Sequence, residues 1–200
     1  MGDTFGISFG VGNLRASNGS IVPDGSLVIA VADTSGQGTN GLLNLSPSTP
    51  VAPGSLIGSG NLILNLNMFP NHFPLDGYFL GEVYQTLTSP LATGQDVYIL
   101  WFPQLTLAAT TVGAGTEYGI FGGSIGTSYS VGEGGNPWTI PVGGAFVSMY
   151  ADEAENFGSV PQSLLTAKSQ AIPEPSTITL EGMGLVAVFA IRMARVSSSK

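Results

Sequence analysis

Short apolar runs, separated by glycine, proline and asparagine, recur along the first 150 residues and most constrain the fold of this chain. Runs of this length bounded by turn residues are typical of strands in all-β domains. With 29 glycines and 13 prolines in 200 residues, long helices are disfavoured in this part of the chain. The expected strands are Thr4–Val11, Ser26–Ala32, Asn61–Asn67, Tyr78–Thr88, Asp96–Phe102, Leu105–Val112, Glu117–Gly122 and Gly144–Tyr150. We therefore predict an all-β domain, an antiparallel, jelly-roll-like β-sandwich spanning residues 1–168.

Two of these runs carry more detail. Leu62, Leu64 and Leu66 alternate with other residues, which predicts one core-facing stripe. Ser26–Ala32 is almost entirely apolar, which indicates a central strand covered on both faces. Asn18-Gly19 suits a two-residue hairpin turn in which both residues have positive φ.

Charge and residue counts exclude several classes of protein. The chain has 13 acidic and 5 basic residues, one histidine and no cysteine. Without cysteine there is no disulfide, thiol nucleophile or Cys-ligated metal. A chain with a net charge of −8 lacks the basic surface that nucleic-acid binding needs, so we expect no nucleic-acid partner. Three of the five bases, Arg192, Arg195 and Lys200, lie at the very end of the chain.

The last thirty residues differ in composition from the rest. Residues 169–177 form a proline-containing linker with the motif Pro173-Glu174-Pro175-Ser176-Thr177. Proline lacks an amide donor and disfavours helix at the residue before it, so this segment is expected to be extended. An apolar stretch follows over 178–191, before the terminal bases. We expect 178–200 to be a single short transmembrane helix with a basic tail on the cytoplasmic side.

This order of motif, apolar helix and terminal arginines resembles the PEP-CTERM sorting signal of bacterial exported proteins. The resemblance implies that an exosortase recognises Pro173–Thr177 and that Arg192, Arg195 and Lys200 flank the membrane. It also implies transient membrane anchoring, then release to the cell envelope or extracellular matrix in an exopolysaccharide or biofilm setting. The alternative is an ordinary linker and C-terminal helix in a soluble protein.

The first residues of the given sequence do not match the pattern of an export leader. Met1–Phe5 includes an acid and no base, and no long apolar segment follows. We therefore expect that the given start lies inside a longer reading frame; the alternative is a chain that is not exported.

Candidate catalytic residues are few. His72 lies between two prolines near Asp76, but no Gly-x-Ser-x-Gly motif supplies a nucleophile. Glu82, Asp96 and Glu117 lie in or beside expected strands and could form a carboxylate pair for glycoside hydrolysis. The simpler interpretations are a loop histidine and outward-facing strand acids. We predict no enzymatic activity and no catalytic residue.

The sequence contains two candidate ligand sites. The oxygen-rich segment 33–38 makes Asp33 the best candidate ligand for a structural calcium ion, ahead of the acids near residue 152. Solvated turn acids are the simpler interpretation, and no other cofactor is expected. Trp138, in a loop after a proline, is the candidate sugar-stacking residue, whereas Trp101 is expected in the core.

The preferred hypothesis is a non-enzymatic, exported envelope or matrix protein with a structural or adhesive role. The alternative is a carbohydrate-binding module on the same route, which binds extracellular polysaccharide through Trp138. An acidic glycan hydrolase is a third hypothesis.

Overall fold

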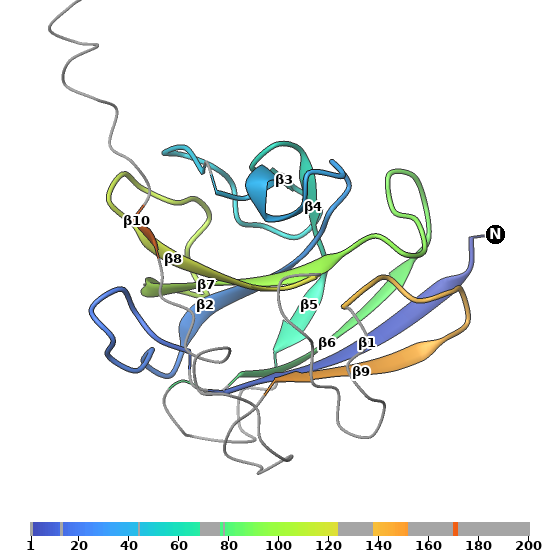
Figure 1. Ribbon diagram of the computed structural model, residues 1–200, viewed down its shortest axis with the longest axis horizontal. Coiled ribbons are helices and arrows are strands. Elements are labelled where there is room, and N and C mark those ends of the chain that lie inside the picture. Colours follow the sequence, from blue (N-terminus) through green and yellow to red (C-terminus); the bar gives the residue numbers. More distant parts are fainter. Residues whose placement is uncertain are drawn as a thin grey trace, which may run out of the picture.

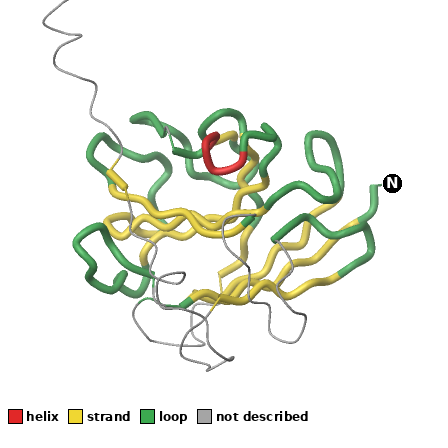
Figure 2. The backbone as a smooth tube through the Cα atoms, viewed as in Figure 1, coloured by secondary structure: helices red, strands yellow, loops and turns green. Residues whose placement is uncertain are grey.

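The computed structural model describes residues 2–12, 14–43, 45–68, 77, 79–123, 138–151 and 170–171. These residues form an all-β structure of two sheets, with one short 3₁₀ helix, η1 (Gly38–Gly41). Figure 1 shows the two sheets as separate layers, and Figure 2 shows loops and η1 over the outer side of the upper one. The all-β prediction is confirmed for the described part of the chain.

The smaller sheet has four strands in the order β5-β6-β1-β9. Their bounds are β1 Thr4–Val11, β5 Leu66–Met68, β6 Phe79–Thr86 and β9 Phe146–Ala151. β1 pairs antiparallel with β6 but parallel with β9. This sheet is therefore mixed. The purely antiparallel arrangement that we predicted is wrong here, because β9, more than 130 residues after the end of β1, joins β1 as a parallel partner.

The larger sheet has six strands in the order β10-β8-β7-β2-β4-β3. Their bounds are β2 Ser26–Ala32, β3 Leu56–Ile57, β4 Asn61–Ile63, β7 Val97–Thr106, β8 Glu117–Gly122 and β10 Gln170–Ala171. In β10, Gln170 pairs with Tyr118 and Ala171 with Glu117. Residues 170 and 171 of the expected linker 169–177 therefore belong to the edge of this sheet.

Strand β2 separates two hydrophobic clusters. Val28, Ala30 and Ala32 face a cluster that also contains Phe5 and Phe9 of β1, so side chains of both sheets pack together. Leu27, Ile29 and Val31 face a second cluster on the other side of the larger sheet. Loop residues, Leu42, Leu45, Val51 and Val112, close that second cluster. Every residue of β2 is buried, which confirms the prediction of a central strand covered on both faces.

The leucine stripe contacts the core as predicted, but not from one strand. Leu64 is buried in the cluster between the sheets, and Leu62 and Leu66 pack against it. The predicted strand Asn61–Asn67 instead divides into β4 of the larger sheet and β5 of the smaller one. The Leu64 amide donates to the Ala30 carbonyl at 2.8 Å just before the chain crosses between sheets. Alternation predicts which face is buried, but it does not show which sheet supplies the hydrogen bonds.

Two local predictions are also corrected. The predicted strands Asp96–Phe102 and Leu105–Val112 are not separate. Strand β7 runs without a break from Val97 to Thr106, and the Ala109 amide then donates to the Thr106 carbonyl in a turn. In the hairpin before β2, only Gly19 has positive φ, at 84°. The Gly19 amide donates to the Ala16 carbonyl and the Ala16 amide to the Ser20 carbonyl. This geometry is a turn closed by one left-handed glycine, and not a two-residue turn with both φ values positive.

Candidate functional site

Asp33 organises the loop between β2 and η1. Its carboxylate accepts hydrogen bonds from the Ser35 hydroxyl at 2.9 Å and the Gly38 amide at 2.7 Å. Asp33 is only 7% exposed, so the simpler interpretation of a solvated turn acid is wrong for this residue. Aspartate side chains commonly stabilise turns by such bonds to nearby donors. A calcium ion at Asp33 would have to share these two oxygens with the loop's own donors.

A second acid lies beside Asp33. The Asp33 amide donates to the Asp96 carbonyl at 2.8 Å, and the Tyr98 hydroxyl donates to the Asp96 carboxylate at 3.1 Å. Burial, followed by the negative charges of Asp96 and Asp33, raises the pKa of Tyr98 well above its usual value. The tyrosine therefore stays neutral and acts as a donor, which favours a structural role for this polar cluster.

Asn61 completes the same cluster with an unused donor. Its side-chain oxygen accepts a hydrogen bond from the Ser35 amide at 3.2 Å. Its amide nitrogen is buried and makes no hydrogen bond. A free donor does not suit a cation, and among the described residues no three His, Cys, Asp or Glu side chains gather as a metal-ion site.

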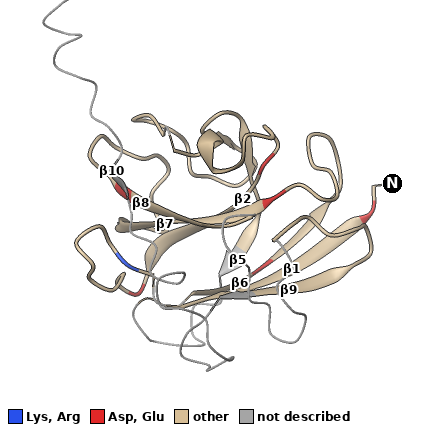
Figure 3. Cartoon of the chain, viewed as in Figure 1, with Lys and Arg blue, Asp and Glu red and all other residues tan. Residues whose placement is uncertain are grey.

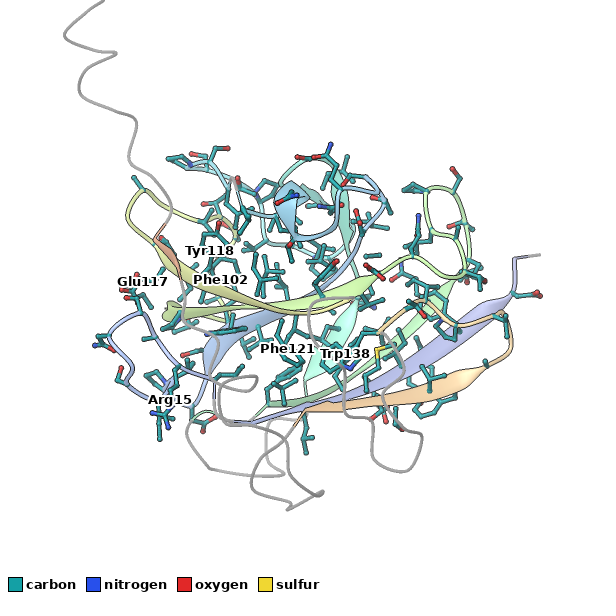
Figure 4. All side chains as sticks on the ribbon, viewed as in Figure 1. Arg15, Phe102, Glu117, Tyr118, Phe121 and Trp138 are labelled. Atoms are coloured by element: carbon teal, nitrogen blue, oxygen red, sulfur yellow. The ribbon has the colours of Figure 1, made fainter. Side chains whose placement is uncertain are left out.

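Trp138 lies in the core and not on the surface. It is 1% exposed, with its ring 5.8 Å from that of Phe9 and 5.2 Å from that of Phe121. Figure 4 shows Trp138 and Phe121 between the two sheets. The prediction that Trp138 stacks on a sugar is wrong, because its ring faces are covered by protein. A loop position was a poor guide to exposure, since this loop residue folds inward against β1 and β8.

Trp101 is fully buried, which confirms its predicted place in the core. Its indole nitrogen donates to the Arg15 carbonyl at 3.0 Å and ties the loop before β2 to β7. By contrast, the indole nitrogen of Trp138 is buried and makes no hydrogen bond.

The three strand acids lie at separate places in the fold. Glu82 is on β6 of the smaller sheet, Asp96 precedes β7, and Glu117 begins β8 and accepts a hydrogen bond from the Ser17 hydroxyl. Within the described ranges Arg15 is the one basic residue, and it donates to the Gly19 carbonyl at 2.9 Å. Figure 3 shows the acidic positions, in red, spread over both sheets. The described surface is therefore acidic overall, as the sequence predicts.

An exposed aromatic pair lies on the outer face of the smaller sheet. Tyr84 of β6 and Phe146 of β9 are 53% and 51% exposed. Their ring centroids are 5.8 Å apart and the ring planes are inclined by 31°. Gly6 of β1 lies between them, paired with Tyr84 on one side and Phe146 on the other. We call these three residues the aromatic row.

A polar row lies two residues further along the same strands. Ser8 of β1 pairs with Glu82 on one side and Ser148 on the other. Because side chains alternate between faces, these three residues share the outer face with the aromatic row. Desolvation, the charge of Glu82 and a hydrogen bond with Glu82 raise the pKa of Tyr84, so its hydroxyl is neutral at ordinary pH. The expected strands Tyr78–Thr88 and Gly144–Tyr150 include Tyr84 and Phe146, but only the strand order brings the two rings together.

The remaining predicted residues lie outside the described ranges. These are His72, Asp76, the sorting-signal residues Pro173–Thr177, and the bases Arg192, Arg195 and Lys200. The expected C-terminal helix over 178–200 also lies outside them. Across the part of the chain that the structure describes, no helix is long and apolar enough to cross a membrane.

Comparison of the whole chain with protein-family models, with curated proteins and with solved structures found no match.

Proposed function

We propose that this chain is a non-enzymatic bacterial surface or matrix protein, exported and then processed at a C-terminal PEP-CTERM signal. In this proposal the two sheets form a jelly-roll-like sandwich that is the mature domain. The segment 178–200 is a transient membrane helix with Arg192, Arg195 and Lys200 at its cytoplasmic end. An exosortase is the processing partner, and the role of the released domain is structural or adhesive.

The observation that carries the proposal is the order of features at the C-terminus. Pro173–Thr177, the apolar stretch and the terminal bases follow one another without interruption by another domain. Strand β10 ends at Ala171, two residues before Pro173. The motif therefore begins two positions after the last described strand, and a cut after Ala171 would leave the described strands of the larger sheet intact.

Intact-mass spectrometry of the protein from its native cells tests the proposal. We expect an envelope or medium fraction to contain a chain that ends between Ala171 and Ser176. Replacing Glu174 and Pro175 by alanine should block this processing, whereas Pro161→Ala, outside the motif, should not. A wild-type chain that still ends at Lys200 and stays in the cytosol would refute the proposal.

The second candidate is a carbohydrate-binding module on the same export route. Trp138 no longer supports it, because that side chain is buried. The exposed pair Tyr84 and Phe146 favours it instead.

A further inference from the structure

We propose that the outer face of the smaller sheet is a binding site for a neutral glucan, with Tyr84 and Phe146 as the stacking residues and Glu82, Ser8 and Ser148 as the polar contacts. This inference gives a site and a ligand class to the second candidate function. It does not depend on processing of the C-terminal tail, because it concerns only the folded sheet.

The two rings of the aromatic row lie closer together than the spacing of their strands would place them. Tyr84 and Phe146 lie on strands separated by β1, and neighbouring strands are about 4.8 Å apart. Their ring centroids are nevertheless only 5.8 Å apart, so the two rings lean toward each other above Gly6. The two half-exposed rings lie close together over Gly6 and expose apolar area on the outer face. A pyranose with equatorial hydroxyls presents an apolar C–H face that matches such a surface.

Gly6 permits this arrangement. A Cβ at residue 6 would overlap the Phe146 ring and lie 3.2 Å from Cε1 of Tyr84. The rings therefore cover bare backbone, and any side chain at this position would push them apart. The opposite side of β1 is different: Phe5, Ile7 and Phe9 are buried in the core. β1 thus separates a packed inner face from an outer face with small residues and exposed rings.

The polar row supplies hydrogen-bonding groups beside the rings. Glu82, Ser8 and Ser148 lie two residues along the strands, which is roughly 7 Å from the aromatic row. A carboxylate accepts hydrogen bonds from hydroxyl groups, and a serine hydroxyl can both donate and accept. A ring stacked on Tyr84 or Phe146 therefore has hydroxyl-binding partners within reach of its edge.

Charge selects the ligand class. Stacking rings also bind single-stranded nucleic acids, but those sites combine the rings with a positively charged groove. Here Glu82 lies beside the rings, and Arg15, the one base among the described residues, lies in the loop before β2. Phosphate and uronate polymers would be repelled, whereas a neutral glucan would not. The alternative that the pair only stabilises the sheet as cross-strand neighbours predicts no glucan binding.

The test measures binding of the full-length chain to cellohexaose and laminarihexaose by isothermal titration calorimetry. We expect binding to at least one of them, and none to oligogalacturonate or oligothymidylate. Tyr84→Ala and Phe146→Ala should each weaken binding about tenfold or more, since each removes one stacked ring. Tyr84→Phe should keep most of the affinity. Leu56→Ala is the matched control, because Leu56 is 55% exposed but lies on β3 of the other sheet.

Thermal unfolding of each variant separates a binding defect from a folding defect. If an alanine variant does not fold, saturation-transfer NMR on the wild-type chain tests the stacking directly. Stacking predicts magnetisation transfer from the aromatic protons of the protein to the C–H protons on one face of a glucan ring. Three results would overturn the proposal: no binding of either glucan, equal binding by folded alanine variants, or a glucan-insensitive dimer that Tyr84→Ala dissociates. None of these outcomes bears on whether the tail is processed.

Discussion

The contact between Trp101 and Gly119 gives the sharpest stability prediction. These residues pair across β7 and β8, and the Trp101 ring lies directly on the glycine. A Cβ at residue 119 would overlap two atoms of the ring and lie 2.6 Å from Cη2. Carbon atoms in ordinary contact are about 3.5–4.0 Å apart, so Gly119→Ala must move the indole by an ångström or more.

The expected loss has two causes. Overpacking a well-filled core costs about 1–3 kcal/mol. Moving the indole also strains or breaks its 3.0 Å hydrogen bond to the Arg15 carbonyl, and a buried group left without its partner costs about 1–3 kcal/mol. We therefore expect Gly119→Ala to lower the free energy of unfolding by about 2–6 kcal/mol. That is a large part of the roughly 5–15 kcal/mol of an ordinary domain.

Urea unfolding of the full-length chain, followed by far-UV circular dichroism, measures this loss. Gly113→Ala is the matched control: its Cβ would lie 3.6 Å from Oγ1 of Thr116, an ordinary contact, and we expect a change within about 0.5 kcal/mol. In a Trp101→Phe background the cost of Gly119→Ala should shrink, because the smaller ring lacks the outer indole atoms. An equal cost in both backgrounds, or a loss below about 1 kcal/mol, would refute the reasoning.

Other predictions concern the polar groups. Asp33→Asn should lower the free energy of unfolding by about 1–3 kcal/mol, because Ser35 and Gly38 donate to different carboxylate oxygens and an amide has only one oxygen. The control Asp3→Asn, at an exposed position, should change it little. Urea unfolding measures both variants. The free energy of unfolding should fall above pH 10, because the raised pKa of Tyr98 keeps its hydroxyl protonated in the folded chain while the same hydroxyl ionises in the unfolded chain. The expected slope is up to about 1.4 kcal/mol per pH unit. Chemical denaturation at pH 9–12 should show a flatter slope for Tyr98→Phe. Glu82→Gln should weaken glucan binding severalfold without changing the melting temperature. Titration calorimetry and thermal unfolding measure the two quantities. Unchanged glucan affinity would mean that the polar row takes no part in binding.

Strand bounds were predicted correctly where the apolar residues and the flanking turn residues of one segment define the strand. Thr4–Val11, Ser26–Ala32 and Glu117–Gly122 were predicted with the bounds that the structure has. These segments either alternate or are apolar throughout, and turn residues bound them, so local chemistry alone defines them. Asn61–Asn67 failed, because its alternation continues while the chain changes sheets at Leu64 and Asn65.

The candidate sites show the same limit more clearly. Trp138 was chosen because it follows a proline in a loop, but Phe9 and Phe121, far away in sequence, cover it. Asp33 was singled out as a candidate calcium ligand, and its carboxylate accepts hydrogen bonds from Ser35 and Gly38, which are close to it in sequence. Its neighbour Asp96 could not be inferred, because that contact depends on how β2 and β7 pair.

The sequence by itself determined the β-class of the described chain, its acidic surface, its central buried strand and the motif that suggests export. These properties follow from composition and from patterns within one segment. Only the tertiary structure decided which exposed rings meet. Tyr84 and Phe146 are 62 positions apart, and they form one surface because β6 and β9 both pair with β1 in the register that places Gly6 between them. That register arises from hydrogen bonds between distant strands and from burial of the opposite face, which no single segment of the sequence contains.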